Sequence, residues 1–208
     1  MPPKPVNQGQ IDFWFDFLSP FGWFASLRLE EIAARHGRAT EWHSMLLGVS
    51  VLKVMGLKPL LETPLKGDYL RTAAARYARR HELTFKTAKG VPPISPLPPA
   101  RAFQWAKVHR PEIYKRFGAD LYAAYWRDGR NIGDTEIIAE IGANHELDGQ
   151  ALTDAITSNE MRELLRGEVD ASLDRGVFGS PFIIVDDEPF WGVGTLEELE
   201  AWLDGGGW

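Results

Sequence analysis

The residues of this sequence best suited to chemistry are Ser19-Pro20-Phe21-Gly22. They follow an alternating apolar stretch, Ile11 to Phe17, that predicts a strand, and they precede a stretch with helical spacing. Serine is a favoured N-cap and proline is tolerated at the first helical position, so a helix should start here. A helix N-terminus favours an anion, to which the Ser19 hydroxyl can donate a hydrogen bond. The alternative is that Ser19 serves only as an N-cap.

A second candidate site is Gly179-Ser180-Pro181-Phe182, which lies just before a predicted strand, Phe182 to Val185. Proline has no main-chain N–H to give to a ladder, and it is tolerated at the first position of a strand. By itself the Ser180-Pro181 dipeptide therefore indicates only the start of a strand. Its meaning depends on where the fold places it relative to Ser19.

A third candidate site is the segment Trp191-Gly192-Val193-Gly194-Thr195. It resembles part of a glycine-rich dinucleotide loop, but Glu197 stands where the third glycine would be and no βαβ unit surrounds it, so dinucleotide binding is not expected. Main-chain N–H groups at a helix start can instead hold a carboxylate. The alternative is a tight turn in which Thr195 caps a helix, Leu196 to Leu203.

Several kinds of site are excluded by residue type and spacing. The chain has no cysteine, which excludes disulfides, dithiol redox sites and a cysteine nucleophile of its own. Its histidines show no H-E-x-x-H or H-x-E spacing, and there is no G-x-S-x-G motif, so neither a metal site nor a serine triad is expected. Any thiol chemistry must use a thiol from another molecule.

Composition and charge bear on partners and compartment. The net charge is 23 − 29 = −6, which disfavours nucleic acid as a partner. One basic cluster is expected to line a solvated helix face: Arg71, Arg76, Arg79 and Arg80. No apolar run approaches the roughly 18 residues of a membrane span, and the first ten residues lack the apolar stretch of a signal peptide. We expect no membrane partner and a cytoplasmic protein.

The elements that must position these residues are predicted in the order β, α, β, a helical block, α, β, β, α. The first strand and helix are followed by a strand over Ala39 to Met45. Helical spacing then dominates, with Asp134 and Ser158 as plausible N-caps. The chain ends with a helix reaching about Arg175, two short strands joined by an acidic turn, and a last helix.

This order predicts an α/β protein with a thioredoxin-like fold and a large inserted all-helical domain. The expected division is residues 10–45 plus 168–208 for the thioredoxin-like domain and 46–167 for the insert. Thioredoxin-like redox proteins carry Cys-Pro-x-Cys where this chain has Ser19 and Gly22, so dithiol exchange is excluded. Such folds also place a cis proline where Pro181 stands.

With these residues in hand, the sequence resembles the 2-hydroxychromene-2-carboxylate isomerase family, in the DsbA-like branch that also holds the kappa glutathione transferases. No single matching piece is specific, but their order along nearly the whole chain is. The matching pieces are Phe15-Asp16-Phe17-Leu18-Ser19-Pro20-Phe21, Leu46-Leu47-Gly48, Lys53, Gly56, Lys58-Pro59, Pro64, Lys66, Tyr69, Gly129-Arg130-Asn131-Ile132-Gly133-Asp134, Val177-Phe178-Gly179-Ser180-Pro181 and Phe190-Trp191-Gly192.

The resemblance implies a glutathione-dependent enzyme, usually dimeric, that acts on a small aromatic compound. By the match, Ser19 holds the glutathione sulfur, the backbone of Ser180 before Pro181 pairs with the tripeptide, and Lys53 lies near the aromatic substrate. The remaining glutathione contacts are expected from Trp191, Gly192, Val193, Gly194 and Thr195, and further substrate contacts from Lys58, Phe21 and Trp126. The alternative is that the two aromatic side chains are core residues.

The sequence departs from its relatives at two places. Many relatives have Asn or Asp followed by Arg after the Trp-Gly, where this chain has Val193-Gly194-Thr195, and Leu57 stands where Asn often precedes Lys-Pro. The expected function is a glutathione-dependent cis–trans isomerase of aromatic catabolites. The alternatives are a kappa-type glutathione transferase and a non-catalytic thioredoxin-like binding module.

Overall fold

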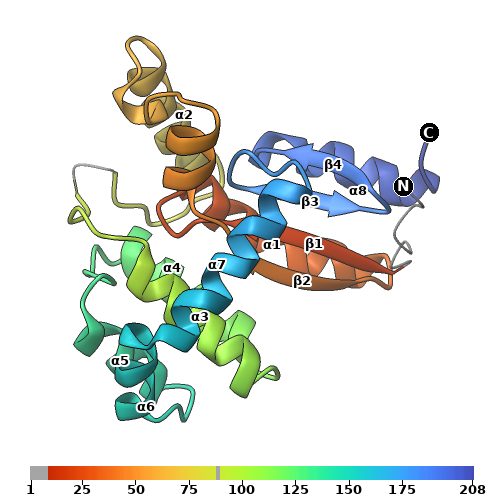
Figure 1. Ribbon diagram of the computed structural model, residues 1–208. Helices are drawn as coiled ribbons and strands as arrows, with labels where there is room; N and C mark the ends of the chain where they lie inside the picture. Colours follow the sequence, from red (N-terminus) through yellow and green to blue (C-terminus); the bar gives the residue numbers. More distant parts are fainter. Residues whose placement is uncertain (1–8, 88–89) are drawn as a thin grey trace.

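The chain places a small mixed sheet beside a block of helices, and the computed structural model describes residues 9–87 and 90–208 (Figure 1). Most of the first ten residues, on which the absence of a signal peptide was argued, therefore lie outside the described residues. The predicted order of elements is confirmed. The elements at the two ends of the chain are β1 (Gln10–Phe15), α1 (Pro20–Arg35), β2 (Ala39–Ser44), β3 (Phe182–Val185), β4 (Glu188–Trp191) and α8 (Leu196–Gly205).

The sheet has the strand order β2-β1-β3-β4. Strand β1 pairs parallel with β2 and antiparallel with β3, and β3 and β4 form an antiparallel hairpin. The hairpin turns at Asp186 and Asp187, which both adopt positive φ. Because β1 lies between an early strand and a late one, the end of β1 is brought close to the start of β3 in space.

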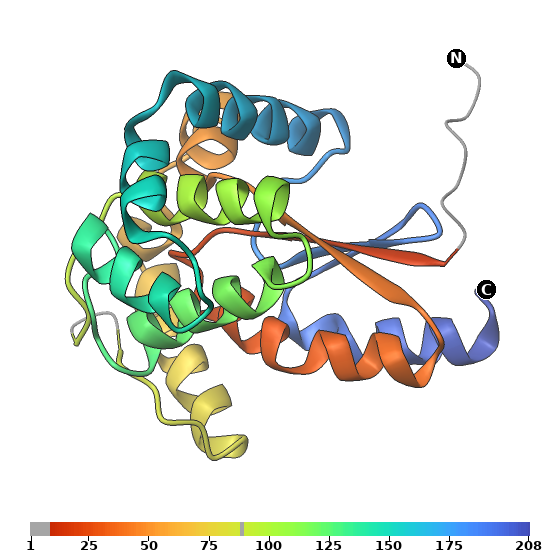
Figure 2. The ribbon, with the colours of Figure 1, turned by 90° about the horizontal axis from the view of Figure 1, so that it is seen from below.

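The two faces of the sheet bury different residues. Phe13 and Phe15 point to one face with Ile183, in the main core cluster that also contains residues of α1 and α8. Trp14 and Phe182 belong to a second cluster on the opposite face. Figure 2 shows α1 and α8 on one side of the sheet and α7 (Asn159–Asp174) on the other. The largely buried strand predicted from the sequence is thus present, with both of its faces covered.

Helical segments occupy the chain between β2 and β3. They are η1 (Gly48–Val54), a π-helix, η2 (Leu60–Glu62), a 3-10 helix, and the α-helices α2 (Lys66–Arg80), α3 (Leu97–His109), α4 (Tyr114–Trp126), α5 (Thr135–Ala143), α6 (Gly149–Thr157) and α7. The expected N-caps are confirmed: Asp134 accepts the N–H of Glu136, and Ser158 accepts that of Met161. The basic cluster on α2 is exposed, as expected: Arg71, Arg76, Arg79 and Arg80.

The helical block and the sheet share one hydrophobic core. The ring of Phe15 lies 5.1 Å from that of Phe103 on α3, and the ring of Phe17 lies 5.0 Å from that of Tyr122 on α4. Helix α7 also runs unbroken through position 167, where the expected insert ends. The described residues include no helix that is both long and apolar enough to cross a membrane.

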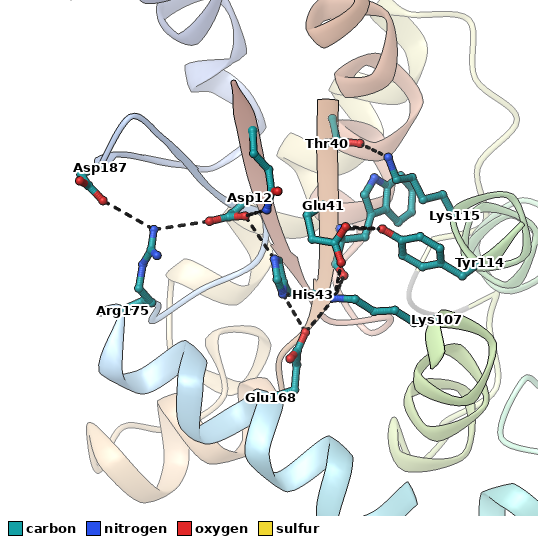
Figure 3. A network of polar contacts seen from close by, with 12 residues as sticks. Asp12, Thr40, Glu41, His43, Lys107, Tyr114, Lys115, Glu168, Arg175 and Asp187 are labelled. Atoms are coloured by element: carbon teal, nitrogen blue, oxygen red, sulfur yellow. Dashed lines mark hydrogen bonds and ion pairs between the residues drawn. The ribbon is translucent and has the colours of Figure 1, made fainter. Parts of the chain in front are cut away.

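A polar network joins α3 and α7 to the sheet (Figure 3). His43 on β2 lies between Asp12 on β1, at 3.3 Å, and Glu168 on α7, at 2.7 Å. Lys107 on α3 contacts Glu168 at 3.2 Å and Glu41 at 2.9 Å. Burial lowers the pKa of His43, but its bonds to the two carboxylates outweigh burial and raise that pKa overall.

Candidate active site

Ser19 caps α1 at the point where β1 has ended. Its backbone is extended, Pro20 occupies the first helical position, and its Oγ accepts the N–H of Gly22 at 3.0 Å. The N–H of Ser19 donates to the carbonyl oxygen of Asp16 at 2.9 Å, which fixes the loop between strand and helix. The predicted helix start is therefore present, and its cap is nearly buried, at 5% exposure.

The fold brings Ser19 into direct contact with the second candidate site. The Ser19 hydroxyl donates to the carbonyl oxygen of Ser180 at 2.7 Å, across 161 residues of sequence. The Ser180–Pro181 peptide bond is cis. In return, the Oγ of Ser180 accepts the N–H of Asp16 at 3.0 Å. Two segments singled out separately in the sequence thus form one site.

Gly22 has a steric reason to be glycine. A Cβ at this position would lie 2.5 Å from the Oη of Tyr122 and 2.7 Å from the Oγ of Ser180. Helix α4 therefore approaches the start of α1 closely on the side where Ser180 lies. This packing leaves no room for a side chain at Gly22, the fourth residue of the Ser19-Pro20-Phe21-Gly22 motif.

The third candidate segment packs against the second. A Cβ on Gly179 would lie 2.3 Å from Nε1 of Trp191, so the indole covers this glycine closely. The N–H of Gly192 donates to the carbonyl oxygen of Pro181 at 3.0 Å, and Gly192 has a φ of 93°, which favours glycine. Trp191 remains half exposed beside the ring of Phe178.

The side chain of Thr195 does not cap α8 as expected from the sequence. Residues Val193–Thr195 form a 3-10 turn ahead of α8, and no main-chain N–H donates to the Thr195 side chain. Its hydroxyl instead donates to the carbonyl oxygen of Gly192 at 2.9 Å. The short turn places that carbonyl within reach, so the hydroxyl closes the turn.

The predicted substrate lysines lie on the exposed segment after β2. Lys53 belongs to η1 and Lys58 to the irregular segment that follows, and both side chains are exposed. Among the described residues, neither ammonium group forms an ion pair, and neither bonds to Ser19 or Ser180. The structure thus shows two free cations on this segment without bringing them into contact with Ser19.

The two predicted aromatic contacts have different surroundings. Phe21 is half-buried and packs edge-on against Phe24, at 6.1 Å between ring centroids. Trp126 is a core residue with 3% exposure, and its Nε1 donates to the carbonyl oxygen of Phe17 at 3.0 Å. Trp126 therefore supports the loop before Ser19 from within, and of the two only Phe21 offers surface to a substrate.

Sequence reasoning missed Asp16. Its carboxylate is fully buried and accepts main-chain N–H groups from Leu18 and Leu47, each at 2.8 Å. Burial raises the pKa of Asp16 to about 6, although both hydrogen bonds act to lower it. A signal was available, because Asp16 stands at the end of the predicted strand and ahead of Ser19-Pro20, and an aspartate at the start of a turn can accept the main-chain N–H two residues later, as it does from Leu18.

A cavity of about 410 Å³ lies elsewhere, between α1, β2 and α4. Its lining includes Ser26, Glu30 and Lys115 but none of the predicted site residues. This cavity is therefore separate from the donors around Ser19. Within the described part of the chain, no group of His, Asp and Glu side chains is arranged to hold a metal ion.

The arrangement around Ser19 suits a small anionic or thiol-bearing peptide. The Ser19 hydroxyl lies at the N-terminus of α1, and the carbonyl oxygen of Ser180 accepts a hydrogen bond from that hydroxyl and from no other group among the described residues. The N–H of Ser180 has no hydrogen-bond partner among the described residues. A ligand with an extended backbone can pair with both groups of Ser180 while its negative charge lies at the helix start.

The chain is similar to several curated proteins. The curated relatives include 2-hydroxychromene-2-carboxylate isomerases from Sphingobium xenophagum, 26% identical over 93% of this chain and 97% of the relative, and from Pseudomonas sp. strain C18, 26% identical over 94% of this chain and 90% of the relative.

Solved structures share the fold. A 2-hydroxychromene-2-carboxylate isomerase superposes with a TM-score of 0.83 at 24% identity, over 94% of this chain and 95% of that one. The cytosolic disulfide reductase DsbM from Pseudomonas aeruginosa, solved with GSH, superposes with a TM-score of 0.66 at 16% identity, over 95% and 98% of the two chains. They confirm the α/β thioredoxin-like fold with a helical insertion.

The model of the DSBA-like thioredoxin domain matches residues 10–204. Because this match takes in the sheet, the helical block and all three candidate segments, the chain belongs to the DSBA-like thioredoxin domain family.

Proposed function

We propose that this protein is a glutathione-dependent isomerase that acts on small aromatic catabolites, of the 2-hydroxychromene-2-carboxylate isomerase type. The observation that carries the proposal is the contact between the Ser19 hydroxyl, at the start of α1, and Ser180 before its cis proline, in a chain without cysteine. A site of this kind suits a thiol that another molecule brings. The named isomerase relatives supply the reaction type.

Residues of this chain fit glutathione at its main chain and its sulfur. The unpartnered N–H and the carbonyl of Ser180 suit an extended peptide, and the Ser19 hydroxyl and the N–H groups of α1 suit the sulfur. The N–H groups of Val193 and Gly194 remain for a carboxylate, because both the N–H and the hydroxyl of Thr195 already donate to the carbonyl oxygen of Gly192. When bound, glutathione would supply a thiolate that adds to the conjugated double bond of the substrate, permits rotation and leaves.

The task of Ser19 is to stabilise the thiolate. A thiol with the ordinary pKa of about 8.5 is about 3% ionised at pH 7, whereas a pKa lowered by two units would make it about 75% ionised. A hydroxyl that donates to the sulfur, next to the positive end of the α1 dipole, acts in this direction. The buried position of Ser19 strengthens both effects because little water screens them.

Ser19 must change its hydrogen-bond partner to do this. In the structure its hydroxyl donates to the carbonyl oxygen of Ser180. An amide N–H of a peptide ligand that donates to the same carbonyl would take over this acceptor and free the hydroxyl for the sulfur. Pairing of the ligand backbone and activation of its thiol would then be coupled through one carbonyl group.

Lys53 is proposed to hold the carboxylate of the aromatic substrate. It is an exposed cation without an ion-pair partner among the described residues, on the segment that follows β2. Lys58 lies on the same segment, and Phe21 offers a partly exposed ring next to Ser19. Because such chemistry draws on reduced glutathione, we place the protein in the cytoplasm.

The direct test is a calorimetric titration of the protein with glutathione, followed by an isomerisation assay on a chromene carboxylate with and without glutathione. We expect saturable binding and conversion that depends on glutathione. Absence of binding at millimolar glutathione contradicts the proposal. A glutathione conjugate as product would identify a transferase instead, and binding of a partner protein without conversion would identify a binding module.

We also propose that the protein is a homodimer that associates through the exposed apolar side chains of Val54, Leu57 and Leu65. These side chains are unusual for a surface that faces only water: Leu65 is 89% exposed, Val54 61% and Leu57 56%. They lie along one part of the chain, from the last residue of η1 to the residue before α2. A second copy of the same segment would cover them.

A further inference from the structure

We propose that Asp16 is a positioning residue that holds Ser19 in register with the segment that carries Lys53. The inference rests on the proposed function, in which Ser19 binds the thiol and Lys53 binds the substrate. It comes from the hydrogen bonds of Asp16 itself, which connect four separate parts of the chain.

The carboxylate of Asp16 joins two segments that are distant in sequence. Its Oδ1 accepts the N–H of Leu18, the residue before Ser19, and its Oδ2 accepts the N–H of Leu47, each at 2.8 Å. Leu47 is the N-cap residue of η1, the π-helix that contains Lys53. One buried side chain thus ties the start of α1 to the start of η1.

The main chain of Asp16 completes the connection. Its N–H donates to the Oγ of Ser180 at 3.0 Å. Its carbonyl oxygen accepts both the N–H of Ser19, at 2.9 Å, and the Oη of Tyr122 on α4, at 2.8 Å. Both main-chain groups and both carboxylate oxygens of Asp16 are therefore engaged, and two of these bonds go directly to Ser19 and Ser180.

The pattern requires a carboxylate. Two main-chain N–H groups point at the two oxygens of a side chain that is 1% exposed, so water cannot replace a lost acceptor. Asparagine has the same shape but one oxygen only, and its NH₂ group would face one of the two N–H donors. Asp16→Asn should therefore release either the loop before Ser19 or the start of η1 while leaving packing nearly unchanged.

The experiment compares the wild-type protein with Asp16→Asn and with Asp148→Asn as the matched control. Asp148 also accepts two main-chain N–H groups, from Gln150 and Ala151, but it is an exposed N-cap of α6. Hydrogen exchange of residues 17–22 and 46–54 is measured by mass spectrometry, together with kcat, KM and the pKa of bound glutathione from thiolate absorbance.

For Asp16→Asn we expect faster exchange in at least one of the two segments. In the folded enzyme we expect kcat/KM to fall roughly tenfold to a hundredfold, as misplaced groups commonly cause, through a higher KM for the aromatic substrate or a higher thiol pKa. Asp148→Asn should leave these quantities at wild-type values.

Unchanged exchange in both segments overturns the proposal, whatever the ligand. Faster exchange with wild-type KM and wild-type thiol pKa also overturns it, because Asp16 would then be structural only. If the wild-type protein neither binds glutathione nor turns over, the proposed function fails, and the exchange data alone decide whether Asp16 joins the two segments.

Discussion

At the scale of single residues, Ser19 and Asp16 differ in how their polar groups are bonded. The Ser19 hydroxyl is suited to bind a ligand, whereas every polar group of Asp16 is hydrogen-bonded within the protein. Ser19 can exchange one acceptor for another because its hydroxyl has a single donor bond, to Ser180. Asp16 cannot, because its oxygens are held by donors from several elements. The first property suits a group that meets a ligand, and the second suits a group that holds the site in place.

Ser19→Ala should lower kcat/KM about tenfold to a hundredfold, since a hydrogen bond to a charged group is worth about 1.5–3 kcal/mol. The pKa of bound glutathione should rise toward that of the free thiol, which thiolate absorbance against pH would show. The matched control is Ser26→Ala, a buried serine of α1 whose hydroxyl donates to the carbonyl of Trp23. Wild-type turnover in Ser19→Ala would remove Ser19 from the mechanism.

The raised pKa of Asp16 makes a prediction about stability. Burial raises the pKa of Asp16 from its ordinary value of 3.8 to about 6, so the folded protein binds more protons than the unfolded chain between these pH values. Stability from this group is therefore fully present below the unfolded pKa and is lost as the pH rises through about 6. From pH 7 to pH 5, the wild-type protein should gain about 1 kcal/mol more unfolding free energy than Asp16→Asn.

Urea denaturation of both proteins at pH 5 and pH 7 measures this difference. Other titrating groups, such as His43 with its raised pKa, are present in both proteins and largely cancel in the comparison. Equal pH dependence in the two proteins would show that the carboxyl of Asp16 does not titrate in this range.

At the scale of elements, a polar network connects α3 and α7 to the sheet. Lys107 links the two helices to β2, since it contacts Glu168 and Glu41 and donates to the carbonyl oxygen of Trp42 at 2.7 Å. These groups are largely shielded from water, so removing the Lys107 ammonium group leaves the carboxylates of Glu41 and Glu168 without this positive partner.

Lys107→Met should therefore destabilise the protein by about 2–3 kcal/mol, somewhat less than a fully buried pair costs. Urea denaturation at pH 7 measures the change, and Lys86→Met, at an exposed position, should stay within about 0.5 kcal/mol of wild type. A loss as small as that of the control would mean that hydrophobic contacts alone dock the two helices.

At the scale of the whole molecule, the exposed segment between η1 and α2 predicts association. Leu57→Glu combined with Leu65→Glu places charges in the proposed contact, and burying them against a second copy is unfavourable. Sedimentation velocity should show a dimer for the wild type and a monomer for the double variant. Leu164→Glu on α7, which is 38% exposed, is the control and should remain dimeric. A monomeric wild type contradicts the homodimer.

The sequence by itself determined the order of the elements, the helix start at Ser19 and the absence of any thiol. Strand alternation, helical spacing, and caps such as Asp134 and Ser158 act between residues close in the chain, so they can be read without tertiary structure. The absence of cysteine is a matter of composition.

Only the tertiary structure decided how these pieces form a site. The Ser19–Ser180 bond depends on β1 lying next to β3, and the burial of Trp126 depends on how α4 packs. The acceptors of Asp16 and the turn closed by Thr195 depend on which N–H and carbonyl groups the fold brings within about 3 Å. Residue type gives a side chain its capacity to bond, but contacts across the chain choose its partner.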